Sequence, residues 1–331
     1  MITRVKVLLG GHAHEGGDPI NRFPGYSFIY DATCTDYDWL VIYDEIPEDG
    51  VGTVRDGHET AYCPKSHTIL CTSEPVSIKH YSHAFTRQFG HLLTNRPQTA
   101  ERHSHYHFGQ GYYESRTGRT REGDFDAVIP PKTKLISTVC SSKQMRHTSH
   151  FARYQLTRDI AAAVPGLDWY GYGVRPLKRK ADVLDEYRYY LAIENHIAAG
   201  HWTEKLSDAF LCECLPFYAG DPAIIDVFPE RSIIPIPLYD REEAVRIVRT
   251  AIANGEYEKR REAVLEAKRL ILEKYNFWSQ VINVIESEAK DDPGTWSPYP
   301  IWDRKTLRKR NVGAMLEDGW FHFRQYTGAS L

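Results

Sequence analysis

The pattern of hydrophobic and polar positions divides the second half of the chain into alternating elements. Apolar runs of strand length alternate with stretches of helical length, and turn residues lie between them. Runs typical of strands are KLISTVC (134–140), LDWYGYG (167–173), YYLAIEN (189–195), LPFYAG (215–220) and SIIPIPL (232–238). Stretches typical of helices are 150–164, 181–188, 203–214, 241–255, 257–274 and 277–290. The alternation of strands and helices predicts a parallel sheet covered by helices on both faces.

The first half shows the same alternation less regularly. Predicted strands are RVKVLLGG (4–11), DWLVIYDE (38–45) and HTILCTSEP (67–75). Apolar positions in 83–93 have a mixed spacing that fits neither a strand nor a helix. Residues 94–124 are polar and rich in His, Tyr and Arg, which favours loops and short hairpins.

The clearest domain boundary is the pair Pro130-Pro131, which separates two apolar runs. We therefore expect an N-terminal domain at 1–130 and a C-terminal domain at 131–290. A tail at 291–331 is expected to pack back on the N-terminal domain or to lie on a membrane surface. The length agrees, because 331 residues suffice for two domains of ordinary size. The predicted fold class is α/β, with two parallel sheets whose strand ends face a cleft.

Composition and charge narrow the class of protein. Hydrophobic residues make up 42% of the chain and charged residues 26%, as in soluble globular proteins. The net charge of −3 argues against nucleic-acid binding, which needs many basic residues to neutralise phosphates. The basic run DRKTLRKR (303–310) lies near Trp302 and Trp320, and we expect it to face either solvent or an anionic membrane surface.

Targeting signals and cysteines bear on the compartment. The apolar run at the start is only about five residues long, too short for a secretory signal. No window of about 18 apolar residues could span a membrane. The six cysteines have no metal-ligand spacing, so they are interpreted as reduced core thiols. We therefore expect a cytoplasmic protein, either in solution or peripheral on the inner face of the membrane.

The stretch HWTEKLSDAF (201–210) holds the strongest candidate chemistry. Thr203 is a plausible N-cap, and the unpaired backbone N–H groups of a helix start favour an anion. Lys205 opposes the helix dipole in the first turn unless an anion joins it. Arg153, on the helix after the preceding strand, could approach the same point, and two cations at a helix start could bind a diphosphate without a metal. Glu204 could accept hydrogen bonds from ribose hydroxyls; the alternative is an ordinary helix start whose Glu and Lys face water.

A longer stretch, YRYYLAIENHIAAGHWTEKLSDAFLCECLPFYAGDP (187–222), resembles the donor-binding region of the α-1,3/4-fucosyltransferases, glycosyltransferase family 10. The matching pieces are Ile193-Glu194-Asn195, Thr203-Glu204-Lys205, Pro216 and Gly220-Asp221-Pro222. The resemblance extends upstream to the strand, the Arg-bearing helix and the next strand. It implies a GT-B fold of two Rossmann-like domains, with the sugar nucleotide held by the C-terminal one. It also implies inverting transfer of L-fucose from GDP-fucose to a glycan hydroxyl.

The same resemblance implies roles for single residues. Arg153 and Lys205 match the cations that bind the pyrophosphate, and Glu204 matches the acid that binds the ribose. Asn195 matches the amide near the sugar and the phosphate, and we count Glu194 and His201 in the same donor-binding set. His201 stands where the family usually has Tyr, and Trp202 where it has Val or Ile. These two departures leave transfer of another GDP-linked sugar as an alternative.

An inverting transfer also needs a general base beside the acceptor hydroxyl. The candidate is Glu74, which ends a predicted strand of the first domain at a place where the family has a Glu-containing motif. The match is partial, because Pro75 follows directly, and the alternative is a solvated acid at a strand end. In HYHFGQGYYE (105–114), His105, His107 and Tyr112 are weaker candidates for acceptor contacts, since their rings can stack on sugars.

Two patterns could hold a metal. The pair in DFD (124–126) has the Asp-x-Asp spacing that other glycosyltransferases use for a divalent ion, and RHSHYHF (102–108) places three histidines two positions apart. Neither has an evident complete ligand set, so we predict no metal and no cofactor beyond the donor. A rival from another class is a glycan- or nucleotide-binding protein that keeps the fold and has lost catalysis.

Overall fold

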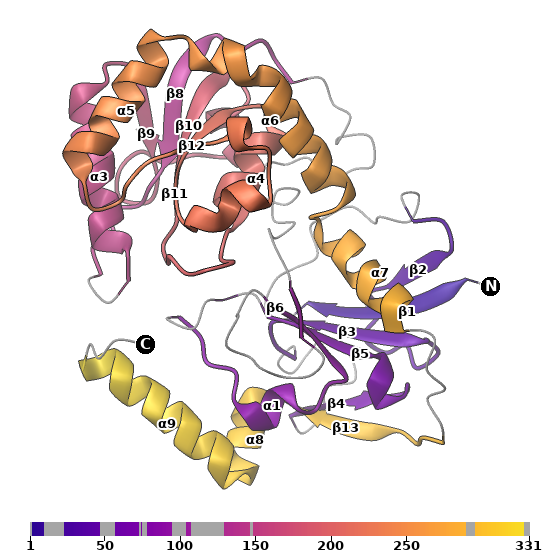
Figure 1. The fold of residues 1–331 in the computed structure, drawn as a ribbon. Coiled ribbons are helices and arrows are strands. Elements are labelled where there is room, and N and C mark those ends of the chain that lie inside the picture. Colours follow the sequence, from indigo (N-terminus) through magenta and orange to yellow (C-terminus); the bar gives the residue numbers. More distant parts are fainter. Residues whose placement is uncertain are drawn as a thin grey trace. The chain divides into compact units, whose positions relative to one another are not determined.

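The chain forms two compact units in a computed structural model (Figure 1). The structure describes residues 2–9, 23–46, 57–72, 74, 78–94, 104–106, 129–145, 148–288 and 295–327. Unit 1 comprises Met1–His107 together with Trp278–Leu331, and unit 2 comprises Phe108–Phe277. The predicted limits at 130 and 290 differ from this division.

Unit 1 is built on a parallel six-stranded sheet of order β2-β1-β3-β5-β6-β7. Its strands are β1 (Thr3–Leu9), β2 (Tyr26–Ile29), β3 (Trp39–Tyr43), β5 (Thr68–Cys71), β6 (His91–Thr94) and β7 (Ser104–Tyr106). Every residue of β3 and β5 is buried, as expected for central strands covered on both faces. The undecided stretch 83–93 contains the short helix α1 (His83–Thr86) and the start of β6.

A second, two-stranded sheet joins the C-terminal part of the chain to unit 1. Strand β13 (Tyr299–Trp302) pairs antiparallel with β4 (His58–Ala61). The last two helices, α8 (Arg304–Arg310) and α9 (Val312–Thr327), follow β13. Helix α7 (Phe277–Glu288) also belongs largely to unit 1, because Trp278 packs its ring 4.7 Å from the ring of Phe28. This contact explains why the division falls at the first residue of α7 and not after the helix.

A buried ion pair lies between the two sheets of unit 1. The Lys6 ammonium donates to Glu59 Oε1 at 2.8 Å and to the Ala32 carbonyl at 2.7 Å, and neither charged side chain is exposed to solvent. Removing one partner of such a pair leaves an uncompensated buried charge, which typically costs about 3–5 kcal/mol. The pair therefore connects β1 to β4, and through β4 to β13.

Unit 2 is a parallel five-stranded sheet of order β12-β11-β10-β8-β9. Its strands are β8 (Lys134–Val139), β9 (Leu167–Tyr170), β10 (Tyr187–Ile193), β11 (Leu215–Ala219) and β12 (Ile234–Pro235). Its helices are α3 (His150–Ala163), α4 (Glu204–Leu211), α5 (Arg241–Ala253) and α6 (Glu256–Glu273). Figure 1 shows α3 beside α5 and α4 beside α6, with the strands between the two pairs.

The strand order of unit 2 contains a topological switch point. From β8 the chain passes through α3 to β9 on one side, and then returns to β10 on the other side of β8. Where the connections that follow two neighbouring strands run in opposite directions, a crevice forms at the carboxyl ends of those strands. Ligands of open α/β sheets bind in this crevice. The expected site therefore lies beyond Val139 and Ile193, the last residues of β8 and β10.

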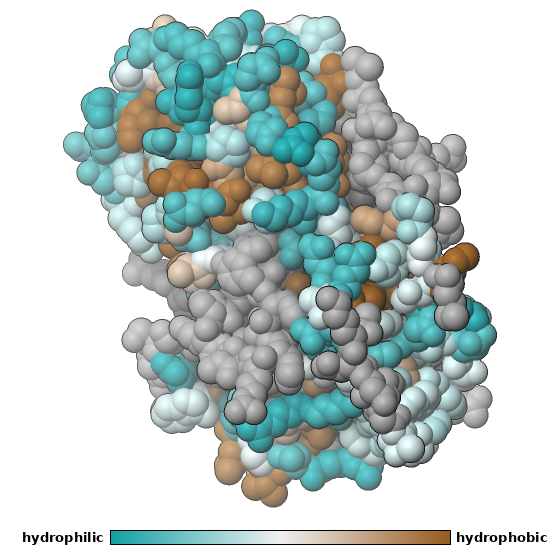
Figure 2. Space-filling model, turned by 45° about the vertical axis from the view of Figure 1, so that its right-hand side comes forward, coloured by the Kyte–Doolittle hydropathy of each residue, from teal (hydrophilic) through white to brown (hydrophobic). Residues whose placement is uncertain are grey.

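The predicted parallel sheets are thus confirmed in both units, and most predicted elements are present. The helix expected over 181–188 is wrong, since only a 3-10 turn at Lys180–Val183 precedes β10, which already begins at Tyr187. Hydrophilic residues cover much of the visible face of unit 2, in the upper part of Figure 2, with hydrophobic residues scattered among them.

All six cysteines are free, and five of them are buried. Burial raises the pKa of Cys63 to about 12 and that of Cys214 to about 11. The thiolate is the reactive form, so these thiols should be inert in the folded protein. We predict that Ellman's reagent at pH 8 modifies only the half-buried Cys34 quickly in the native protein, and all six after denaturation. A Cys34→Ser variant should lose the fast phase, and fast modification of further thiols would contradict the described packing.

Candidate functional site

A cavity of about 440 Å³ lies at the switch point of unit 2. Its lining comes from the ends of β8 and β10, from α3 and α4, and from the segment that follows β9. The lining residues are Val139, Ser141, Arg153, Gly171, Tyr172, Leu177, Lys178, Lys180, Tyr190, Asn195, Glu204 and Lys205. Four of these side chains are basic and one is acidic, so the cavity favours an anion.

Arg153 is the most constrained of the four basic residues. It is only 7% exposed, and its Nη1 donates to Asn195 Oδ1 at 2.6 Å while its Nη2 donates to the Val139 carbonyl. These contacts fix the guanidinium between the ends of β8 and β10. Within the described residues no carboxylate pairs with Arg153, and no acceptor reaches its Nε. A buried guanidinium without a carboxylate partner favours the binding of an anionic ligand, because burying an unpaired charge is costly.

The start of α4 has the geometry that the sequence predicts. Thr203 is the N-cap in an extended conformation, and its Oγ1 accepts from the Lys205 backbone N–H at 3.4 Å. Glu194 is fully buried and accepts from the Thr203 backbone N–H at 3.0 Å and from its hydroxyl at 2.8 Å. The predicted N-cap is therefore confirmed, and Glu194 acts on the cavity by holding that cap in place.

Lys205 is paired, in contrast to Arg153. Its Nζ lies 3.0 Å from Thr203 Oγ1, 3.2 Å from Glu204 Oε1 and 3.4 Å from Glu194 Oε2. The ammonium is thereby held against the first turn of α4 with little exposure. Two carboxylates near one ammonium offset its positive charge, so a bound anion would meet Lys205 as part of a network.

Two further lysines were not foreseen from the sequence. Lys180 is buried and forms an ion pair with the buried Asp208, whereas Lys178 is exposed at the cavity. They lie between β9 and β10, where the chain has only a 3-10 turn and no periodic pattern. The signal that could have indicated them is the basic run LKRK (177–180) directly after a predicted strand end.

Two aromatic residues also line the cavity. Tyr172 is 82% exposed and follows Gly171, whereas Tyr190 lies inside β10. Burial raises the pKa of Tyr190 far above its usual value, so its hydroxyl stays protonated. An exposed ring beside a cationic cavity can stack on a flat ligand group such as a nucleobase.

The other predicted site residues fall in different places. His201 is buried against His196, with the rings 5.3 Å apart, and it is not among the described residues that line the cavity. Trp202 packs in the core against Phe228. Glu74 belongs to unit 1 and is exposed, just beyond the carboxyl end of β5.

The remaining candidates cannot be placed at a site. His105 lies in β7, and only its backbone is described. His107, Tyr112 and the DFD motif at 124–126 lie outside the described residues. Among the described residues, no group of three or more His, Cys, Asp or Glu side chains could hold a metal ion.

The fold and the cavity define a class. Two doubly wound α/β units, one with a cationic cavity at its switch point, are characteristic of GT-B glycosyltransferases. A solved structure titled as an alpha1,3-fucosyltransferase with GDP superposes on the chain with a TM-score of 0.52. That comparison covers 88% of this chain and 92% of the solved one at 13% identity, so it establishes the shared fold alone. The GT-B fold predicted from the sequence is confirmed.

The sequence of unit 2 is similar to one glycosyltransferase family. Residues 129–254 match the C-terminal domain of glycosyltransferase family 10 (fucosyltransferase). A segment of 66 residues is 33% identical to the alpha-(1,3)-fucosyltransferase FucT of Helicobacter pylori. That segment is 20% of this chain and spans only 13% of the length of the Helicobacter enzyme. The family resemblance seen in the sequence is thus confirmed for the domain that carries the cavity.

Close packing at the cavity gives a test of its architecture. Gly171 has a φ of +139°, and a Cβ at this position would lie 2.5 Å from the Cys140 carbonyl oxygen. Gly166 also has a positive φ, but its nearest neighbour would be 3.7 Å away. We predict that Gly171→Ala lowers the free energy of unfolding of unit 2 by about 1–3 kcal/mol more than Gly166→Ala does, because it adds a steric clash to the same backbone strain. Denaturant titration of both variants measures this difference. Equal losses of stability would contradict the close approach of Gly171 to Cys140.

Proposed function

We propose that the protein is an inverting fucosyltransferase that transfers L-fucose from GDP-fucose to a hydroxyl of a glycan acceptor. The observation that carries this proposal is the buried Arg153 guanidinium, which has no acidic partner among the described residues and lies in a cationic cavity of the domain that matches family 10. The cavity volume of about 440 Å³ lies within the roughly 300–1,000 Å³ of typical small-molecule sites. The similar fold of an enzyme solved with GDP supports a guanosine diphosphate as the anion.

In this proposal the diphosphate lies between Arg153, Lys205 and the N-terminus of α4. Arg153 has N–H groups that take no part in the hydrogen bonds described above. These groups would donate charge-assisted hydrogen bonds to phosphate oxygens. The Asn195 side chain accepts from Arg153 through Oδ1, which leaves its NH₂ group to donate to a phosphate or sugar oxygen. Lys178 lies at the cavity as a further cation. With these cations in place, the diphosphate needs no divalent metal.

The nucleoside would be recognised by the acid and the exposed ring of the cavity. Glu204 has a carboxylate oxygen 3.2 Å from the Lys205 ammonium and can accept hydrogen bonds from the two ribose hydroxyls. Tyr172 is exposed at the cavity and offers a face to the base. Glu194 is buried beside Thr203 and Lys205, where it would support the donor site from within the fold. We propose a similar supporting role for the buried His201.

The proposed transfer step uses Glu74 as the general base. The Glu74 carboxylate of unit 1 takes the proton of the acceptor hydroxyl as that oxygen forms a bond to C1 of fucose on the face opposite the diphosphate. The bond between C1 and the diphosphate oxygen breaks, and its electron pair leaves with GDP. Arg153 and Lys205 stabilise the charge that develops on the leaving group. We propose that the acceptor is a glycan, with His105 and His107 of unit 1 and Tyr112 of the segment that follows them as candidate contacts.

Two arginines of α3 allow a test of whether this cavity binds the diphosphate. We predict that Arg153→Ala weakens GDP binding about 10–100-fold in isothermal titration calorimetry, because a charge-assisted contact is worth about 1.5–3 kcal/mol. Arg158 of the same helix is largely exposed and pairs with Asp159, so Arg158→Ala should bind GDP like the wild type. Unchanged GDP affinity in a folded Arg153→Ala protein would remove the diphosphate from this cavity.

The role of Glu74 has a separate test. We predict that Glu74→Gln keeps the affinity for GDP-fucose and lowers the rate of transfer at least about 100-fold, as expected for the loss of a general base. Asp36→Asn, at an exposed acid of the same unit, should retain full activity. Assays with GDP-mannose beside GDP-fucose would define the donor sugar. Transfer by Glu74→Gln at the wild-type rate would exclude it as the base.

A further inference from the structure

Helix α9 is hydrophobic on the face that points to solvent. Its exposed hydrophobic residues have 49–68% of their surface accessible: Val312, Met315, Leu316, Trp320 and Phe323. At 3.6 residues per turn these positions fall on one side of the helix, opposite the buried Ala314 and Phe321. Scattered exposed hydrophobic residues are normal, but five of them on one helix face form a continuous stripe that needs a partner.

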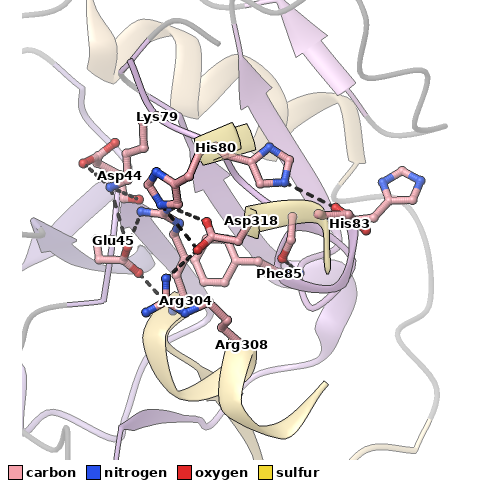
Figure 3. A network of polar contacts seen from close by, with 12 residues as sticks. Asp44, Glu45, Lys79, His80, His83, Phe85, Arg304, Arg308 and Asp318 are labelled. Atoms are coloured by element: carbon pink, nitrogen blue, oxygen red, sulfur yellow. Dashed lines mark hydrogen bonds and ion pairs between the residues drawn. The ribbon is translucent and has the colours of Figure 1, made fainter. Parts of the chain in front are cut away.

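A network of charges fixes this orientation of α9, as Figure 3 shows. Asp318 on the inner face accepts a hydrogen bond from Arg308, and Glu317 Oε2 accepts from the His83 backbone N–H at 2.9 Å. Arg304 donates to Glu45 at 3.2 Å, which ties the start of α8 to the end of β3. Rotating α9 to bury the stripe would break these contacts. The fold therefore holds the stripe toward solvent, and these residues are not part of the core of unit 1.

Positive charge is concentrated in the segment that contains the stripe. Six basic and three acidic residues occur between 303 and 324. Lys305 and Lys309 are exposed and one helical turn apart on α8, and no ion pair connects either of them to a described residue. The lower tip of the molecule in Figure 2, where α8 meets α9 in Figure 1, carries hydrophobic residues next to hydrophilic ones.

We propose that the α8–α9 surface, which comprises Lys305 and Lys309 of α8 and the hydrophobic stripe of α9, docks on a lipid bilayer with anionic headgroups. A helix with an apolar face and basic flanks lies in the plane of the membrane interface, where the apolar residues enter the headgroup region and the lysines meet anionic lipids. A second copy of the chain fits less well, since symmetric pairing would bring like charges together. None of the described helices is long and apolar enough to cross a bilayer, so this contact would be peripheral.

Vesicle co-sedimentation of the whole protein tests the proposal. We expect binding to vesicles of phosphatidylcholine with phosphatidylglycerol, little binding to phosphatidylcholine alone, and release at high salt. Leu316→Ser with Trp320→Ser should lower the partition coefficient at least about tenfold, because apolar burial contributes to interfacial binding. Lys305→Gln with Lys309→Gln should lower it by about fivefold per lysine.

Controls separate this result from general loss of structure. Tyr239→Ser, at a ring that is 78% exposed in unit 2, should bind vesicles like the wild type. All variants should retain the circular dichroism spectrum and melting temperature of the wild type. The proposal would be overturned if the wild type stayed in the supernatant, or if the stripe variant sedimented with vesicles as the wild type does. It would also be overturned if Leu316→Ser with Trp320→Ser turned a dimer into a monomer without any vesicle binding, since the stripe would then be a subunit interface.

Discussion

The site depends on the hydrogen bonds that the buried Arg153 guanidinium donates to Asn195 and to the Val139 carbonyl. These hydrogen bonds join the ends of β8 and β10 to α3, at the one place in unit 2 where the strand order diverges. A guanidinium keeps its charge in any environment, so its burial has an energetic cost that only a hydrogen-bonded anion offsets well. The topology therefore fixes where a ligand binds, and this charge determines that the ligand is anionic.

The cations of the cavity play unequal parts. Lys205 and Lys180 already have carboxylate partners in Glu204 and Asp208, and buried Glu194 adds a second negative charge beside Lys205. These pairs keep the lysines in place and limit the repulsion among the cations when no ligand is present. Arg153 has no such partner within the described residues, so a diphosphate gains most from it. In the proposed reaction, the same preorganised charge stabilises GDP as it leaves.

The sequence predicted much of unit 2 because its strands are buried on both faces and read as continuous apolar runs. Thr203, Lys205 and Arg153 could be found because each follows a strand end in a repeated strand–helix pattern. Lys178 and Tyr172 could not, since the segment between β9 and β10 is irregular. Helix α9 was also missed, because most of its large apolar side chains face solvent while Asp318 is buried, which differs from the usual pattern of an amphipathic helix. The polar network that sets its orientation joins residues more than 200 positions apart, such as Glu45 and Arg304.

The most direct test of the account is a crystal structure of the protein with GDP bound. The account predicts diphosphate oxygens within hydrogen-bonding distance of the Arg153 Nε or Nη atoms and close to the Lys205 ammonium, with the ribose hydroxyls near Glu204. GDP bound elsewhere on the chain, or a diphosphate that leaves Arg153 without an anionic partner, would contradict it.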